Sequence, residues 1–440
     1  MPGESQSVVR TVCGHLTNCG AHDKWKTVPS DVEVLRRLAE RRVEIANDPA
    51  NLDRRRLWYA LDADRGERPM VLAESWVAFD DLPASRTICR EEWAKKIEKE
   101  LRFEIWQFEE VRDDHVVEPW FNVNWRVEVS DYGVASKQEY AERVSGNVSS
   151  RRWEPPIKDL DGDFEKLRPR AYSVDREGTL AWKAHLDEVL DGILRTRFRG
   201  GFYWTTGLTQ AVIDLVGLEQ VMVYMCTNPE GMHRLMAFLQ SDCLAFIDWL
   251  ERERLLSLNN ENDYIGSGSM GYSRALPQAD WKEGDPVRAK DMWTLTESQE
   301  TVGVSPNQFE EFVVSYYRPI VERFGRAYYG CCEPVHDRWQ YVKTLANLKR
   351  VSISPWCNQS IMAEILGRDY VFSRKPNPTH VSTPEFSEDL IRDDLRRTLT
   401  AARDCNVEVI LKDVHTLCGE PGRMARWVRI AREMIEECDR

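Results

Sequence analysis

The stretch of sequence that decides the fold reads Tyr328-Tyr329-Gly330-Cys331-Cys332-Glu333-Pro334-Val335-His336-Asp337. Apolar residues recur every three or four positions over 309–324 before it, and a second run of this kind follows through Trp339, Val342 and Leu345, which is the period of an α-helix. We therefore predict a short strand that ends in a loop between two helices. The loop gathers two thiols, a carboxylate and an imidazole, a combination that suits metal binding or catalysis.

A second polar stretch follows the last predicted strand. The apolar run 407–411 leads directly into Lys412-Asp413-Val414-His415-Thr416-Leu417-Cys418. If both loops open on the same face of one sheet or barrel, their side chains meet.

Strand, polar loop and helix alternate through residues 68–437, which indicates parallel strands joined by helical crossovers. About eight or nine strands over this length favour a decorated (β/α)8 TIM barrel, in the α/β class, over two doubly wound sheets. We predict a partly helical N-terminal extension at 1–50, the barrel at 51–440, and an irregular excursion at 130–170. The predicted strands lie at 68–76, 119–125, 201–205, 256–264, 291–300, 328–331, 350–354, 370–373 and 407–411.

The bulk composition excludes several classes of protein. A formal net charge of -13 and a pI of about 5.3 argue against a nucleic-acid binder, which needs a basic surface. No apolar run reaches the length of a membrane span, and Met1–Arg10 lacks the apolar segment of a signal peptide. The 11 cysteines are scattered without a disulfide framework, which favours a reducing compartment. We therefore expect a soluble cytoplasmic enzyme.

In such a barrel, polar and aromatic residues at the C-terminal ends of the strands line one mouth. The 16 tryptophans suggest a cleft walled by aromatic rings, with packing in a large core as the alternative. Arg374 and Lys375 follow a predicted strand and could hold a substrate carboxylate, although a solvated loop charge is the simpler interpretation. The predicted substrate-binding residues are Trp120, Asn122, Asn124, Trp204, Asn260, Asn262, Gln299 and Trp356.

Several motifs resemble the uroporphyrinogen decarboxylase superfamily, most strongly after about residue 290 and over roughly 50–437. This resemblance implies a (β/α)8 barrel that is either a cofactor-free decarboxylase or a zinc-dependent methyltransferase acting with a corrinoid protein. The decarboxylases carry arginines in an N-terminal segment, and the equivalent Leu72–Phe79 has none, which argues against a porphyrinogen substrate. The motifs are Ser298-Gln299-Glu300 with Ser305-Pro306, the strand ending Tyr328-Tyr329-Gly330-Cys331, the turn Ser352-Ile353-Ser354-Pro355-Trp356, and Cys418-Gly419-Glu420-Pro421.

The methyltransferase branch binds zinc through a His-x-Cys after a late strand and a further cysteine after the last one. Cys331 and Cys418 match the two cysteines, but Tyr329 stands at the position of the histidine. The remaining ligand is then Cys332, His415 or Glu333, and His415 is three residues from Cys418, so that both can reach one ion. We predict Cys331, Cys332, His415 and Cys418 as metal ligands.

The resemblance implies that zinc activates a poor methyl leaving group, or an acceptor thiol, for exchange with a corrinoid. The chain has no Asp-x-His-x-x-Gly corrinoid motif, so the cofactor would come on a partner protein; a homodimer is a further option. A metal-free decarboxylase or lyase of a non-porphyrin acid is the alternative, and a barrel that only binds a ligand is a third. The predicted catalytic residues are Glu333, His336 and Lys412, although Lys412 and Asp413 could simply form an ion pair. Cys13, His15, Cys19 and His22 could hold zinc, but a flexible tail explains them better.

Overall fold

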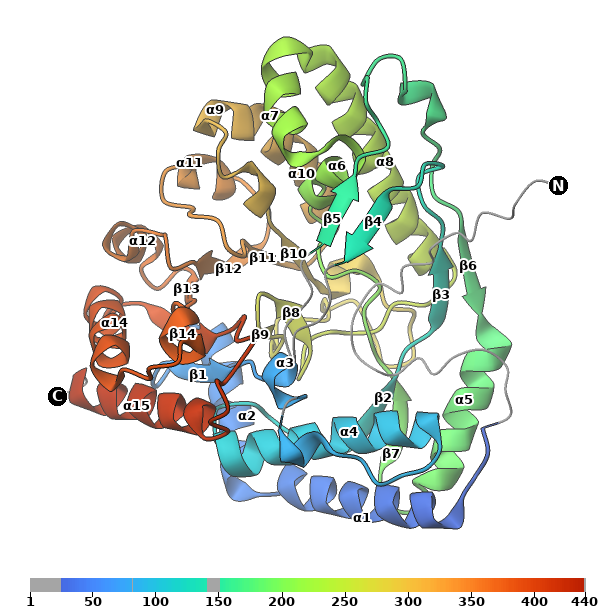
Figure 1. The fold of residues 1–440 in the computed structure, drawn as a ribbon, viewed down its shortest axis with the longest axis vertical. Helices are drawn as coiled ribbons and strands as arrows, with labels where there is room; N and C mark the ends of the chain where they lie inside the picture. Colours follow the sequence, from blue (N-terminus) through green and yellow to red (C-terminus); the bar gives the residue numbers. More distant parts are fainter. Residues whose placement is uncertain (1–24, 81, 141–150, 439–440) are drawn as a thin grey trace.

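The computed structural model describes residues 25–80, 82–140 and 151–438. The cysteine and histidine pairs at 13–22 lie outside these residues. At the centre stands a six-stranded sheet in which every neighbouring pair is parallel (Figure 1). Its strands, in spatial order, are β1 (Met70–Ala73), β14 (Asn406–Leu411), β13 (Val371–Arg374), β12 (Leu348–Ile353), β11 (Arg326–Tyr329) and β10 (Trp293–Thr296).

A second parallel pair, β2 (Trp120–Val123) and β7 (Arg195–Phe198), forms a sheet of its own. The α/β class predicted from the sequence is confirmed, because parallel strands alternate with helices. Closure into a barrel is not seen: within the described part of the chain, no ladder joins β1 to β2 or β7 to β10. Eight strands thus lie in parallel sheets, divided into groups of six and two.

Three of the predicted boundaries were wrong. The strand expected at 201–205 is found at 195–198 instead, because Arg197 donates to the Asn122 side chain of the neighbouring strand (2.8 Å) and so has a partner within the pair. The strand expected at 256–264 begins only at Tyr264. The region 130–170 contains regular structure, since β3 (Arg126–Val129) pairs with β6 (Tyr172–Asp175) and β4 (Lys137–Tyr140) with β5 (Arg151–Glu154), both antiparallel.

Helices cover the outer face of the six-stranded sheet (Figure 1). The outward-facing residues, such as Val71, Val351 and Val409, join the largest hydrophobic cluster, as expected for strands with helical crossovers. The helices are α6 (Thr209–Val216), α7 (Leu218–Thr227), α8 (Pro229–Arg252), α9 (Pro306–Phe309), α10 (Ser315–Val321), α11 (Trp339–Val342), α12 (Gln359–Leu366), α13 (Thr379–Ser382), α14 (Glu388–Ala401) and α15 (Arg423–Cys438).

The inner face of this sheet is filled by other parts of the chain. Met70, Val371 and Ile410 point inward and pack against Trp58 of α2 (Pro49–Asp62). The hairpin of β8 (Tyr264–Gly266) and β9 (Ser269–Met270) lies on the same face, since Ser269 Oγ donates to Glu408 Oε2 of β14 (3.0 Å). A Cβ at Gly266 would come within 2.9 Å of the Tyr328 ring, so glycine permits the hairpin to approach this closely.

The pair β2–β7 has a hydrophobic core of its own. Residues of α1 (Pro29–Ala46), α4 (Glu92–Trp106) and α5 (Arg176–Val189) pack on Phe121 and Val123 of β2, separately from the main cluster. Side chains of α1 and α4 cross-link as well, because Arg42 pairs with Glu104 (2.9 Å). A short helix, α3 (Trp76–Phe79), follows β1.

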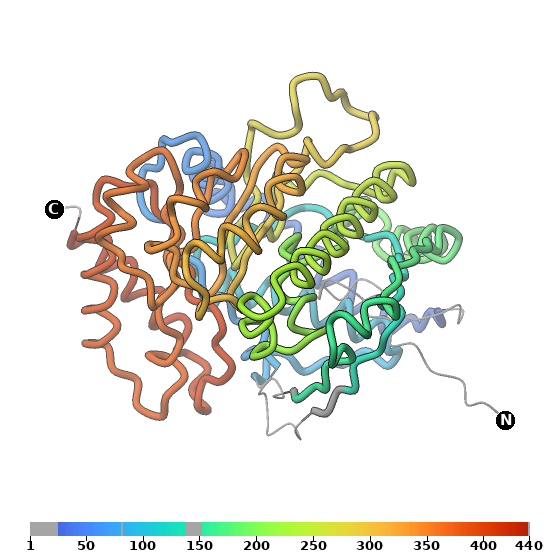
Figure 2. Tube along the Cα trace, turned by 90° about the horizontal axis from the view of Figure 1, so that it is seen from above, coloured from blue at the N-terminus to red at the C-terminus, as the bar shows by residue number. Residues whose placement is uncertain are grey.

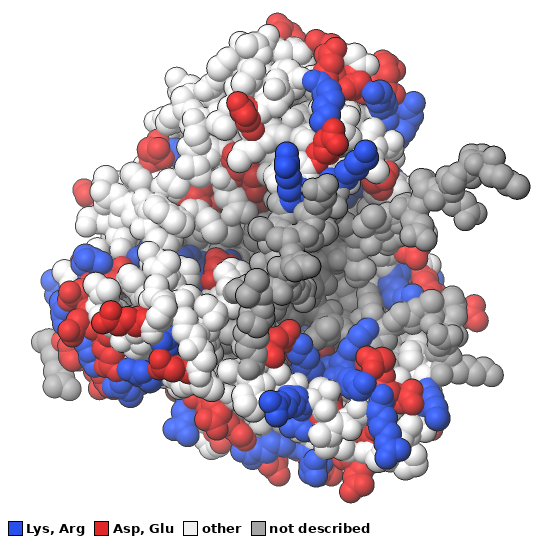
Figure 3. Space-filling model, viewed as in Figure 1, with Lys and Arg blue, Asp and Glu red and all other residues white. Residues whose placement is uncertain are grey.

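The surface in Figure 3 carries both signs of charge interspersed over α15, α1 and α4, and few charges around α9 and α11. The segment between β9 and β10 projects from the molecule in Figure 2. Among the described residues, no helix combines the length and apolar character needed to cross a bilayer.

Candidate functional site

Six side chains meet where the inner face of the sheet ends, at the C-terminal ends of its strands. The strand register explains their direction: Glu74, Lys375 and Lys412 each lie two residues beyond an inward-facing residue, and side chains of a strand alternate between faces. Cys331 and Cys332 follow β11, and Tyr264 comes from the hairpin. We call this group the strand-end cluster: Glu74, Tyr264, Cys331, Cys332, Lys375 and Lys412.

Lys412 is a buried cation at the centre of the cluster. Its Nζ donates to Cys331 Sγ at 3.9 Å and lies 3.8 Å from Asp413 Oδ1. Burial alone would lower the pKa of Lys412, but Tyr264, Cys331, Glu74 and Asp413 outweigh it and raise that pKa well above its usual value. The ammonium therefore stays charged, and it can stabilise negative charge that forms beside it.

Cys331 and Cys332 form a vicinal dithiol, with 3.6 Å between their sulfur atoms. The pKa of Cys332 is lowered because its sulfur accepts a hydrogen bond from the Cys331 thiol, and the positive charge of Lys412 acts in the same direction. The pKa of Cys331 is raised by that same bond and by burial. Cys332, which is the more exposed of the two, is thus the better nucleophile.

Lys375 is enclosed by protein, at 3 % exposure. Its Nζ donates to Tyr328 Oη (2.8 Å) and to Ser373 Oγ (2.5 Å). Burial lowers the pKa of Lys375 to about 7, and the charge of Lys412 adds to the effect. Near neutral pH, Lys412 is therefore charged while Lys375 is only partly protonated, an arrangement that can supply both a cation and a base to one site.

Carboxyl groups lie behind the dithiol. Glu333 is fully buried; its Oε2 accepts from Cys331 N and its Oε1 from Ser298 N, both at 2.9 Å. Burial raises the pKa of Glu333, and burial together with the charges of Glu300 and Glu333 raises the pKa of Glu297 well above its usual value. Glu333 therefore shapes the Cys331 loop, while Glu297 holds its proton more tightly than an ordinary glutamate does.

The other predicted catalytic residue, His336, lies outside the cluster. Its Nδ1 accepts a hydrogen bond from Asn358 N at 3.3 Å and lies 3.7 Å from Cys357 Sγ. His336 thus links the loop after β11 to the loop after β12. Of the three predicted catalytic residues, Lys412 lies in the strand-end cluster and Glu333 holds the backbone of the Cys331 loop. His336 is in neither position.

Most predicted substrate-binding amides are engaged within the chain. Asn122 accepts from Arg197, Asn124 donates to Gly201 O (2.7 Å) and Asn260 donates to Leu276 O (2.8 Å). The ring of Trp120 lies under the Arg197 guanidinium, 5.5 Å from its centroid. Asn262 Oδ1 is buried without a hydrogen-bond partner in the described residues, and Gln299 is half-buried.

Exposed tryptophans follow three of the strands. Trp76 after β1 is 54 % exposed, Trp204 after β7 is 36 % exposed and Trp356 after β12 is 68 % exposed. Two of these rings connect to the strand-end cluster, because Trp76 Nε1 donates to Glu74 Oε1 (3.0 Å) and Trp204 is hydrogen-bonded to Tyr264. Large exposed rings beside a buried polar cluster are typical of a binding surface.

The predicted metal ligands do not gather around one point. Cys418 Sγ donates to Ser382 O of α13 at 3.2 Å, and His415 is exposed. Within the described residues, no group of three or more histidine, cysteine, aspartate or glutamate side chains could hold a metal ion. As placed, Cys331, Cys332, His415 and Cys418 do not fit a zinc ion, because only the first two are brought together.

Tyr264 and Glu74 were not predicted as site residues, and Lys375 was predicted only as a possible contact for a substrate carboxylate. The alternation of side chains along each strand would have identified the two charged residues. Lys375 lies two residues after the inward-facing Ser373, and Glu74 lies two residues after the inward-facing Leu72. Arg374, by the same rule, points outward, where it is buried against Asp394 of α14 (3.1 Å). It is therefore a structural residue rather than a substrate contact.

Comparisons with known proteins leave the family open. No protein-family model matches the chain, and no curated protein matches it. Among solved structures, a methyltransferase from Methanosarcina mazei aligns with 86% of this chain and 97% of its own, at a TM-score of 0.46 and 11% identity. At this level of likeness, we transfer neither its activity nor its residues to this chain.

Proposed function

We propose that the chain is a methyltransferase that acts on a small molecule at the strand-end cluster. The supporting observation is the contact between Cys331 and Lys412, which are far apart in the sequence and belong to loops after different strands of the same sheet. The family resemblance of the motifs around Cys331 and Cys418 points to the same activity. The proposal includes the fold: the strands of the two parallel sheets correspond to those of a (β/α)8 barrel that lacks the ladders between β1 and β2 and between β7 and β10.

Methyl transfer moves negative charge. When a methyl group leaves an ether or thioether, the bond to oxygen or sulfur breaks and the electron pair stays on the leaving atom. A buried ammonium such as Lys412 stabilises that atom in a medium of low dielectric constant. In the opposite direction, a charged Lys412 favours the thiolate of an acceptor, which is the form that attacks a methyl group.

A corrinoid on a partner protein would supply the cobalt centre that accepts or gives the methyl group. Exposed Trp76, Trp204 and Trp356 would contact it, since their rings offer apolar surface beside the cluster. Zinc binding stays a prediction, and no step of the proposal uses it. The cytoplasmic location and a homodimer also stay predictions.

The test is methyl transfer to free cob(I)alamin, with methoxylated aromatic compounds, methylated amines and methyl thioethers as donors, followed by absorbance. We expect transfer with the wild-type chain and a rate at least about tenfold lower in Lys412→Met, because a charge-assisted interaction contributes about 1.5–3 kcal/mol. Lys343→Met, at an exposed lysine after α11, is the matched control. Equal rates in Lys412→Met and Lys343→Met would contradict the proposal.

Metal analysis of protein purified without a histidine tag tests zinc separately. About one zinc per chain, lost in Cys331→Ser and in Cys418→Ser, would establish the predicted ligands. That result would also require the loop after β14 to move Cys418 away from Ser382. A chain without zinc that still transfers methyl groups would leave Lys412 as the group that stabilises charge.

A second candidate is a metal-free lyase of a carboxylic acid. The observation that favours it is the combination of a cationic Lys412, a Lys375 that is only partly protonated near neutral pH, and Glu297, whose pKa lies well above its usual value. A cation would hold the substrate carboxylate; the C–C bond would break, CO₂ would leave, and an acid would protonate the carbon that keeps the electron pair. Release of CO₂ from candidate acids, without methyl transfer, would favour this function.

A further inference from the structure

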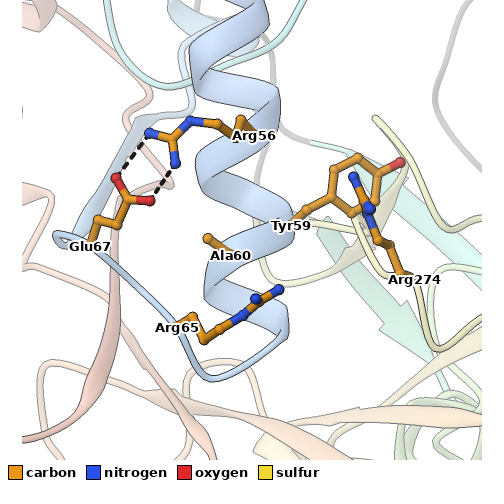
Figure 4. A pocket seen from close by; sticks show the side chains of 6 residues that line it. All are labelled: Arg56, Tyr59, Ala60, Arg65, Glu67 and Arg274. Atoms are coloured by element: carbon orange, nitrogen blue, oxygen red, sulfur yellow. Dashed lines mark hydrogen bonds and ion pairs between the residues drawn. The ribbon is translucent and has the colours of Figure 1, made fainter.

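A pocket of about 260 Å³ lies beside α2, away from the strand-end cluster (Figure 4). It lies at the opposite end of the sheet, because α2 and the link after it lead into the first residue of β1, whereas the cluster follows the last residues of the strands. Its wall joins three parts of the chain: α2, the α2–β1 link and the segment after β9. The lining residues are Arg56, Tyr59, Ala60, Arg65, Glu67 and Arg274.

The pocket carries an excess of positive charge. Glu67 is the one carboxylate in its lining, and Arg56 holds it with two hydrogen bonds, one of them from Nη2 to Oε2 at 2.9 Å. The structure gives Arg65 and Arg274 no ion pair with any residue that it describes. The lining therefore has a net charge of two, or of one when Asp53, which also pairs with Arg56 at 2.9 Å, is counted. Either value exceeds the partial negative charge of about one half at the C-terminal end of α2.

The orientation of the two arginines also suits the binding of an anion. The Arg274 guanidinium lies over the ring of Tyr59, 5.1 Å from its centroid, which orients the guanidinium while its N–H groups stay available. Arg65 extends from the α2–β1 link across the last turn of α2 (Figure 4). In a chain with a formal charge of -13, two unpaired arginines at one cavity form a local site for an anion.

We propose that this arginine pocket binds the diphosphate or triphosphate group of a small molecule. Two planar guanidinium forks match phosphate oxygens, and the volume of 260 Å³ is near the lower limit of small-ligand pockets, about 300 Å³. A single phosphate would leave much of this space empty. The inference is independent of the proposed function.

The test is isothermal titration calorimetry of the full chain at low ionic strength with pyrophosphate, ATP and inorganic phosphate as probes. We expect saturable binding of pyrophosphate or ATP to one site, and about tenfold weaker binding for each of Arg65→Gln and Arg274→Gln. Arg274→Lys, which keeps the charge but not the planar fork, should be intermediate. Arg86→Gln, at an exposed arginine after η1 (Pro83–Ser85), should bind as the wild type does.

Comparison of the probes shows which kind of molecule carries the bound phosphate group. Tighter binding of ATP than of pyrophosphate would identify a nucleotide, and equal binding would restrict recognition to the phosphates; both support the proposal. Binding that is unchanged in the Arg65→Gln/Arg274→Gln double variant, with an unaltered circular dichroism spectrum, would overturn it. Absence of saturable binding to pyrophosphate and ATP would overturn it as well.

Discussion

Replacing Lys412 by methionine should raise the pKa at which the dithiol loses its first proton. Methionine keeps most of the volume of the side chain and removes the charge that lies 3.9 Å from Cys331 Sγ. Two unit charges about 4 Å apart interact by about 4 kcal/mol at an effective dielectric constant of about 20. Since one pH unit corresponds to about 1.36 kcal/mol, about three pH units is the upper limit of the rise. The first proton is lost from Cys332, whose pKa the charge of Lys412 also lowers.

The assay is the rate of alkylation by iodoacetamide as a function of pH, read for the peptide that contains Cys331 and Cys332 by mass spectrometry. Asp413→Asn is the matched control with the opposite sign, because the charge of Asp413 raises the pKa of Cys332. Circular dichroism would show that both variants fold. The reasoning is refuted if the profile of Lys412→Met coincides with that of the wild type.

Three further predictions concern stability. Glu408→Gln should lower the free energy of unfolding by about 1–3 kcal/mol, because it removes the carboxylate 3.2 Å from the fully buried Arg350 and leaves Asp62, at 3.6 Å, as the remaining ion-pair partner. Urea denaturation measures this, and a loss below about 0.5 kcal/mol would contradict it. Lys375 has a folded pKa of about 7 against 10.5 unfolded, so the unfolded chain binds more protons between these values and stability rises with pH there. The free energy of unfolding of the wild type relative to Lys375→Met should thus grow by about 2 kcal/mol from about pH 7 to pH 9, and a constant difference would argue against a neutral Lys375. Asn51→Ala should cost about 1–3 kcal/mol because it removes two buried bonds to the backbone of Val117, at 2.8 and 2.9 Å; a melting temperature equal to that of the wild type would exclude this role.

Local patterns in the sequence predicted much of the sheet. The apolar runs that became β1 and β14 are followed by polar residues, and a buried parallel strand needs no other signal. The strand β7 was misplaced because Arg195 and Arg197 interrupt its apolar pattern. Asn122 and Glu261 stabilise Arg197 there, and contacts so far away in the sequence leave no local pattern. The strand count favoured a barrel, but closure depends on ladders between distant strands, which local patterns do not reveal.

Local sequence patterns also explain why the strand-end cluster was predicted only in part. Cys331 and Lys412 end strands of one sheet, and the position of a strand end is a local property. Lys375 was interpreted as a solvated charge, since lysine is rarely buried without a partner, and only its register relative to Ser373 reveals that it points inward. The direction of Cys418 depends on where α13 lies against the last loop, which spacing within the motif does not encode.

The separate core beneath β2 and β7 has a consequence for how the molecule comes apart. Because α1, α4 and α5 pack on this pair and no ladder joins it to the six-stranded sheet within the described residues, the two regions should open as distinct cooperative units. Amide hydrogens of β2 and β7 would then exchange as one block, with a free energy of opening different from that of β11 to β14. Trp204 follows β7, whereas Trp76 and Trp356 follow strands of the larger sheet, so such an opening would alter the spacing of the exposed rings without unfolding Lys412 or the dithiol.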